Sequence, residues 1–249
     1  MKHTPYILLL WMLLATLPLR AASLAEADEA YIAGNYEQAI ASYQAVLDEG
    51  MHTPDLYYNL GNSYFRTGKL ADAILQYERT LRLDATHADA KHNLAFAQAM
   101  TVDKIDPIGT IFLVEWWAAA CRWQTPTAWA VNSILLFVLC LASVGCFVFA
   151  KPVWLRKTGF SVAIVALFLS VLTACCANFR QNEIDNTSQA IVYIPTVTTK
   201  SSPDKSGNDL FILHEGTKVT IKSTLGEWSE IQTADGNTGW LLTSSIAVI

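Results

Sequence analysis

The sequence has little positive charge, and that charge is not gathered into a patch. Lys and Arg number 17 against 22 Asp and Glu, which gives a formal net charge of -5 over 249 residues. Outside one short stretch near Lys151, the basic residues are not clustered. Proteins that bind nucleic acid present concentrated positive charge to the phosphate backbone. The composition therefore disfavours nucleic acid as a partner.

The sequence also lacks the motifs of common catalytic sites. It contains no glycine-rich phosphate loop and no nucleophile elbow. The five histidines are scattered, and His87 and His92, five positions apart at a predicted helix start, come without the cysteine or carboxylate partner that a zinc site needs. We expect this pair to be exposed to solvent. The sequence predicts a protein that is not an enzyme and that has no cofactor or metal.

Cysteine is missing from residues 26–100 and 190–249. All five cysteines lie within or beside apolar segments: Cys121, Cys140, Cys146, Cys175 and Cys176. In such surroundings a thiol behaves as a small apolar side chain. The cysteines therefore indicate neither a disulfide framework nor a zinc site.

Apolar residues make up 52% of the chain, which is too many for one soluble domain and too few for a transporter of many spans. Two apolar runs, 128–150 and 158–177, are each long enough, at about 20 residues, to cross the hydrocarbon core as a helix. Three positive charges lie in the loop 151–157 between them. The positive-inside rule places this loop in the cytoplasm, so both flanking regions are predicted to lie outside.

The N-terminus has the features of a secretory signal peptide, predicted over residues 1–25. Lys2 precedes the apolar stretch Ile7–Leu17, and small residues follow around Ser23. The cleavage point stays open, and an uncleaved segment would be a further anchor with the same orientation. These signals predict a multi-pass protein of the bacterial inner membrane whose folded domains face the periplasm.

A tryptophan-rich segment, residues 106–125, precedes the first apolar run. Trp116, Trp117 and Trp123 are typical of the headgroup level of a bilayer, and Glu115 is unsuited to its centre. We expect this segment to lie at the membrane interface.

A period of 34 residues runs through residues 26–100. It relates Gly34 to Gly68, Ala39 to Ala73, Ile40 to Ile74, Tyr43 to Tyr77, Leu47 to Leu81, Asn59 to Asn93 and Leu60 to Leu94. The pattern resembles the tetratricopeptide repeat (TPR) family, in which each repeat is a pair of antiparallel helices. Small residues such as Gly61 and Ala73 would let neighbouring helices approach, with aromatic side chains filling the space between them. The resemblance predicts an all-α solenoid of about two and a half repeats.

The TPR resemblance implies a concave groove lined by the first helix of each repeat. The candidate groove residues on this register are Tyr58, Asn59, Asn62, Phe65 and Asn93. An amide side chain suits a bound peptide because it both donates and accepts hydrogen bonds. The alternative, that Asn59 and Asn93 satisfy groups between helices, stays open. Residues 23–105 carry twelve acidic and six basic side chains, which favours a basic or neutral protein partner.

Residues 190–249 contain five short runs with strand character, separated by turn signals: 190–194, 210–213, 218–222, 229–233 and 239–243. They predict a small all-β barrel. Glu215-Gly216-Thr217, Trp228 and Gly239-Trp240-Leu241 resemble the bacterial SH3-like domains, some of which bind the cell wall. Trp228 and Trp240 could stack on a ligand, although we expect at least one of them to fill the core of so small a domain.

The order of TPR repeats, tryptophan-rich segment, two spans around a basic loop and SH3-like domain resembles the BatE family of bacterial Bat aerotolerance operons over the full length. The resemblance implies a non-catalytic membrane scaffold with a role in envelope or oxidative stress tolerance. Its implied partners are von Willebrand factor A-domain membrane proteins, a sister TPR protein and a MoxR-type ATPase. The alternative is an envelope sensor or a peptidoglycan-binding module acting through the SH3-like domain. A sensor is disfavoured because the expected cytoplasmic part, residues 151–157, is too short for an effector domain.

Overall fold

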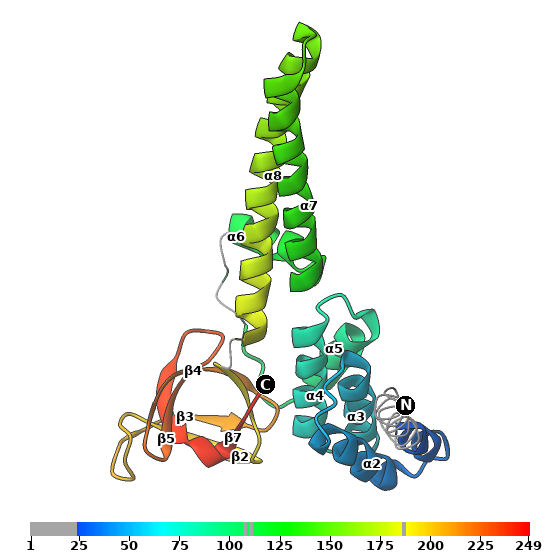
Figure 1. The fold of residues 1–249 in the computed structure, drawn as a ribbon. Coiled ribbons are helices and arrows are strands. Elements are labelled where there is room, and N and C mark those ends of the chain that lie inside the picture. Colours follow the sequence, from blue (N-terminus) through cyan, green and yellow to red (C-terminus); the bar gives the residue numbers. More distant parts are fainter. Residues whose placement is uncertain (1–23, 107–108, 110–111, 186–187) are drawn as a thin grey trace, which may run out of the picture. The chain divides into compact units, whose positions relative to one another are not determined.

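The computed structural model describes residues 24–106, 109, 112–185 and 188–249, so the predicted signal peptide lies almost wholly outside the described residues. The chain divides into two compact units (Figure 1). One unit, residues 1–108 with 187–249, holds the helical repeats and the β domain. The other, residues 109–186, holds the apolar helices. Each unit is described by itself.

Pairs of helices form the repeats of the first unit. The chain is helical over 24–32. The helices that follow are α2 (Tyr36–Asp48), α3 (Pro54–Arg66), α4 (Leu70–Leu83) and α5 (Ala88–Met100). Helix α3 shows a sequence-encoded start, because the Thr53 hydroxyl accepts a hydrogen bond from the Leu56 amide at 3.3 Å and Pro54 occupies the first turn.

The turn inside each repeat is the same structure copied 34 residues later. Gly34 and Gly68 both adopt left-handed backbone angles, with φ of 80° and 78°, which glycine adopts without steric cost. The amide after each glycine then donates to the carbonyl five residues earlier, at 2.9 Å for Asn35 and 3.0 Å for Lys69. These are the bonds of a helix C-terminal Schellman turn. The period in the sequence thus appears directly in the backbone.

The two helices of the second repeat touch where the repeat pattern requires small residues. A Cβ atom added to Gly61 of α3 would lie 2.8 Å from the Tyr77 ring of α4, so only glycine fits without movement. The buried core around this contact includes Tyr43, Leu56 and Ile74. The expectation that Gly61 allows close approach is confirmed.

The C-terminal region is one antiparallel sheet of seven strands in the order β3-β2-β6-β5-β4-β1-β7. The strands are β1 (Gln189–Val192), β2 (Thr196–Lys200), β3 (Asp209–His214), β4 (Lys218–Leu225), β5 (Trp228–Gln232), β6 (Thr238–Leu242) and β7 (Ile246–Val248). An all-β domain is confirmed, but the expectation of five strands is wrong. Strand β2 is mostly threonine and β7 has three residues, so neither shows a clear apolar alternation.

The β domain and the repeats share one hydrophobic core. Ile191 of β1 and Ile249 are buried in the same cluster as the repeat residue Ile74. Polar contacts surround this seam: Lys218 donates to the Glu78 carboxylate at 2.7 Å, and the Tyr193 hydroxyl donates to Asp72 at 3.0 Å. The short solenoid thereby covers part of its apolar surface with the β domain.

A second polar contact joins the β domain to the segment after α5. The Asp103 carboxylate accepts hydrogen bonds from the His214 amide and the Thr217 hydroxyl, each at 2.7 Å. Burial opposes ionisation of Asp103, but the bonds from Thr217 and His214 outweigh it and lower the pKa of that carboxyl. Asp103 is therefore a charged anchor at neutral pH.

The second unit contains α6 (Phe112–Cys121), α7 (Pro126–Phe149) and α8 (Val153–Asp185). Helices α7 and α8 lie side by side (Figure 1), and each is long and apolar enough to cross a membrane. Small residues bring them together: a Cβ on Gly159 would lie 2.9 Å from the Ser143 carbonyl, and the Ser170 hydroxyl donates to the Ser133 carbonyl at 3.0 Å. Such contacts are typical of helix pairs in membranes.

Helix α8 has 33 residues and extends beyond the predicted span 158–177 at both ends. It takes in residues 153–157 of the predicted loop 151–157 and continues to Asp185. No glycine or proline interrupts the polar residues at either end. The helix therefore continues through them.

Candidate functional site

Four of the five predicted groove residues line one cavity of about 320 Å³. They are Tyr58, Asn62, Phe65 and Asn93, and they come from α3 and α5. The remaining lining residues are Tyr31, Arg66, Tyr77 and Phe96. The first helices of three successive repeats thus contribute to one site.

A hydrogen-bond network joins the polar residues of this cavity. The Asn93 amide donates to Asn62 Oδ1 at 2.9 Å and lies 3.3 Å from the Tyr58 hydroxyl oxygen. The Tyr77 hydroxyl donates to the same Asn62 oxygen at 2.8 Å. Burial raises the pKa of Tyr77, so its hydroxyl stays protonated and acts as a donor. This network fixes the orientation of both amides.

Asn59, the fifth predicted residue, lies outside the cavity and belongs to an equivalent network one repeat earlier. Its amide donates to Asp28 at 3.4 Å, and the Tyr43 hydroxyl donates to the same Asp28 oxygen at 2.5 Å. Every member stands 34 positions before its counterpart: Tyr43 before Tyr77, Asp28 before Asn62 and Asn59 before Asn93.

Asn59 and Asn93 therefore link the first helices of successive repeats through side chains. Within the described residues, Asn93 Oδ1 and Asn62 Nδ2 have no hydrogen-bond partner. These two groups of the Asn62–Asn93 network can donate to and accept from a ligand.

The two tryptophans of the β domain lie on its outer face. Burial alternates along β5 and β6, with Ser229, Ile231 and Leu241 inward and Trp228 and Trp240 outward and half-buried. Trp228 stands opposite Leu242. Trp240 is therefore its diagonal neighbour on the same face.

The expectation that one of these tryptophans fills the core is wrong. The buried core of the sheet consists of aliphatic residues: Ala190, Val192, Leu213, Val219, Ile231, Leu241 and Ile246.

Comparison with known families assigns both folded regions of the first unit. Residues 24–88 match the family described as Tetratricopeptide repeat. The N-terminal helices are TPR repeats. Residues 200–247 match the family described as Bacterial SH3 domain, in agreement with the antiparallel sheet. No curated protein matches the chain.

The TPR period could have identified the groove residues that the sequence reasoning missed. Tyr31 precedes Phe65 by 34 positions, and Phe96 follows Asn62 by 34. Applying the 34-residue period to Phe65 and Asn62 would therefore have added Tyr31 and Phe96 to the predicted groove. The rings of Phe65 and Phe96 meet edge to face, with centroids 5.7 Å apart.

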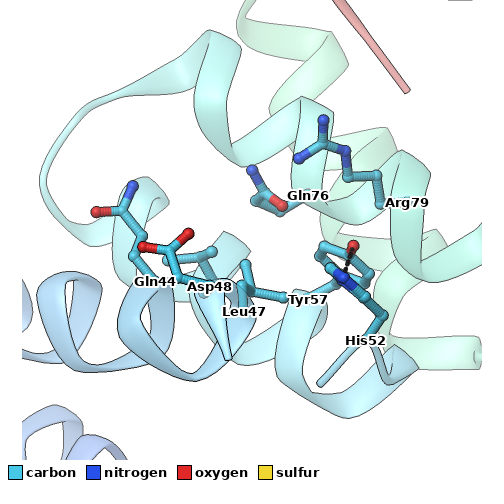
Figure 2. A pocket seen from close by; sticks show the side chains of 8 residues that line it. Gln44, Leu47, Asp48, His52, Tyr57, Gln76 and Arg79 are labelled. Atoms are coloured by element: carbon cyan, nitrogen blue, oxygen red, sulfur yellow. Dashed lines mark hydrogen bonds between the residues drawn. The ribbon is translucent and has the colours of Figure 1, made fainter. Parts of the chain in front are cut away.

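A second cavity, of about 420 Å³, lies between α2, α3 and α4 and was not predicted (Figure 2). Its polar lining includes His52, whose Nδ1 lies 2.8 Å from the Tyr57 hydroxyl. Arg79 lies over the Tyr57 ring and donates to the Val248 carbonyl at 2.8 Å. Gln76 is almost fully buried, and within the described residues its Oε1 has no partner.

The TPR cavity combines amide groups, phenols and aromatic faces. Such surfaces suit the recognition of a peptide. Among the described residues, no group of three His, Cys, Asp or Glu side chains is placed to hold a metal ion.

Proposed function

We propose that the protein is a non-catalytic, membrane-anchored scaffold whose TPR cavity holds a segment of a partner protein. The observation that carries the proposal is the pairing of Asn62 and Asn93. Their mutual hydrogen bond uses Asn93 Nδ2 and Asn62 Oδ1, so Asn62 Nδ2 is left as a donor and Asn93 Oδ1 as an acceptor, and both residues line the cavity. A peptide group presents a carbonyl and an N–H, which complement this pair. Tyr31, Phe65 and Phe96 would contact the peptide's apolar side chains.

The membrane part of the proposal places the protein in a bacterial inner membrane, with the TPR and SH3-like domains in the periplasm. Helices α7 and α8 support the two crossings. The basic residues Lys151, Arg156 and Lys157 lie at and just after the turn between them, which favours a cytoplasmic position for that turn.

We further propose that the scaffold works in a Bat-type aerotolerance complex. The order of TPR repeats, two apolar helices and a bacterial SH3 domain supports this assignment. The expected partners are A-domain membrane proteins, a sister TPR protein and a MoxR-type ATPase.

The groove is tested by changing Asn62 to Asp in the tagged full-length protein. The new carboxylate still accepts from Tyr77 and Asn93, as Asp28 does from Tyr43 and Asn59, so the fold should be kept. The donor Nδ2 is lost and a negative charge is added. We expect recovery of the crosslinked partner to fall by about tenfold, the loss of one hydrogen bond worth about 1.5 kcal/mol.

Gln38→Glu is the matched control, because it adds the same charge on an exposed position of α2 outside the cavity. It should leave recovery unchanged. Equal recovery from the wild type and Asn62→Asp would count against the groove.

Peptidoglycan binding by the SH3-like domain is the second candidate function. Its support is the outward pair Trp228 and Trp240, flanked by Lys200 and Glu230, which stand opposite Trp240 on neighbouring strands. Aromatic faces beside polar groups suit stacking on sugar rings. Sedimentation of the full-length protein with purified peptidoglycan tests this function. Retention should be lost in Trp228→Ala and kept in Ile32→Ala, which truncates an exposed apolar side chain of the first TPR helix, and no retention of the wild type would remove the candidate.

A further inference from the structure

We propose that Cys121 and Cys176 form a disulfide that fastens α6 to α8. The two sulfur atoms lie 2.7 Å apart, although the residues are 55 positions apart in the chain. Both side chains are buried, with exposed fractions of 0% for Cys121 and 4% for Cys176. The packing of α6 on α8 therefore selects one pair among the five cysteines.

Other contacts fix the end of α6 independently of the sulfur atoms. Arg122 donates through Nε to the Glu183 carboxylate at 3.0 Å, and Arg180 donates to the same carboxylate at 3.1 Å. Cys176, Arg180 and Glu183 are spaced four and three residues apart, so they share one face of α8. Cys121 and Arg122 meet that face side by side.

Helix α7 also contacts Cys121. The Trp129 indole N–H donates to the Cys121 carbonyl at 2.8 Å. The position of Cys121 is thus set by hydrogen bonds and an ion pair as well as by the proximity of the two thiols.

The alternative is that both thiols only fill space, as Cys140 does beside Ala163 and Ala166. Carbon atoms in van der Waals contact rest at about 3.5–4.0 Å, and sulfur is larger than carbon. The separation of Cys121 and Cys176 is well inside that distance. Cys175, the neighbour of Cys176, is exposed, so it is not the partner of Cys121.

The expected compartment favours oxidation, and this step rests on the proposed topology. Cys176 stands 19 residues after Lys157 on α8, which is about 29 Å at 1.5 Å per residue. That distance matches the hydrocarbon core, of about 30 Å. If the basic turn is cytoplasmic, the cysteine pair lies at the periplasmic end, where disulfides persist.

The chemistry is thiol–disulfide exchange with an external disulfide, either that of an oxidoreductase or oxidised glutathione. One cysteine loses its proton, attacks the external disulfide and releases one thiol. The second cysteine, as thiolate, attacks the resulting mixed disulfide and releases the other thiol. The pair loses two protons and two electrons, and the external disulfide is reduced to two thiols.

Counting free thiols tests the proposal. Cells making the full-length protein are quenched in acid, and the denatured chain is labelled with a maleimide polymer that shifts its gel mobility. With five cysteines in the chain, we expect three labels on the wild type and five after reduction. Cys121→Ser and Cys176→Ser should each carry four labels with or without reduction. Because labelling follows denaturation, folding defects in a variant do not hide the result.

Cys175→Ser and Cys140→Ser are the matched controls, and each should carry two labels before reduction and four after it. Four labels on unreduced Cys175→Ser would assign the bond to the wrong neighbour and overturn the proposal. The purified wild type is also equilibrated with oxidised glutathione. Three labels there but five from cells would keep the cysteine pair and contradict the periplasmic topology, whereas five labels in both would refute the disulfide.

Discussion

Replacing Ile191 with alanine tests whether the β domain and the TPR repeats share one core. Ile191 belongs to strand β1, yet its fully buried side chain lies in the cluster of repeat residues that includes Ile74. Truncating a buried isoleucine to alanine costs about 2–5 kcal/mol, through lost burial and the cavity left behind. If the core is shared, helix α4 should lose the same stability, although the change is in another domain.

Hydrogen exchange of the full-length protein in detergent, followed by mass spectrometry, measures this effect segment by segment. A loss of 2 kcal/mol or more should speed exchange of the most protected α4 amides by roughly 30-fold or more, since 1.4 kcal/mol corresponds to a factor of ten. Ile212→Ala is the matched control, because Ile212 is 54% exposed on strand β3. Faster exchange in the β strands with unchanged exchange in α4 would refute the shared core.

Two further predictions concern single contacts of the first unit. Gly61→Ala should lower the free energy of unfolding by about 1–3 kcal/mol, because its Cβ would overpack the Tyr77 ring, and denaturant titration of helicity would measure it. The fold lowers the pKa of Asp103 below 3.8, the ordinary value that applies in the unfolded chain. Ionised Asp103 therefore contributes its full stabilisation above pH 3.8, and this stabilisation is lost as the pH falls through the folded-state pKa. Melting temperatures between pH 6 and pH 2 should therefore fall less in Asp103→Asn than in the wild type, and parallel curves would contradict the role given to Thr217 and His214.

The repeat helices could be predicted from the sequence because their determinants are local. Gly34 and Gly68 encode the turns, Gly61 encodes the close helix pair, and the 34-residue spacing repeats both. The residues of the network formed by Tyr77, Asn62 and Asn93 also follow this spacing, because each has a counterpart 34 positions earlier. Which of their atoms have no hydrogen-bond partner depends on side-chain orientation, which the spacing does not record.

Contacts between distant segments could not be predicted in this way. The place of Ile191 in the repeat core depends on how two domains pack, and no periodicity records it. The pairing of Cys121 with Cys176 likewise depends on the docking of α6. Within an apolar segment, the sequence does not distinguish a cysteine that forms a disulfide from one that only fills space as a small apolar side chain.

In-cell photocrosslinking from the TPR groove shows whether the groove holds a partner protein. A photoreactive phenylalanine analogue replaces Phe96, which is 57% exposed and lines the cavity, and in a control it replaces Gln38 on α2. We expect a crosslinked protein partner from position 96 that is absent from position 38 and is lost when Asn62→Asp is added. An A-domain membrane protein or a MoxR-type ATPase as that partner would support the Bat-type assignment. No crosslink from position 96, or the same products from both positions, would contradict the groove as the site that holds a partner.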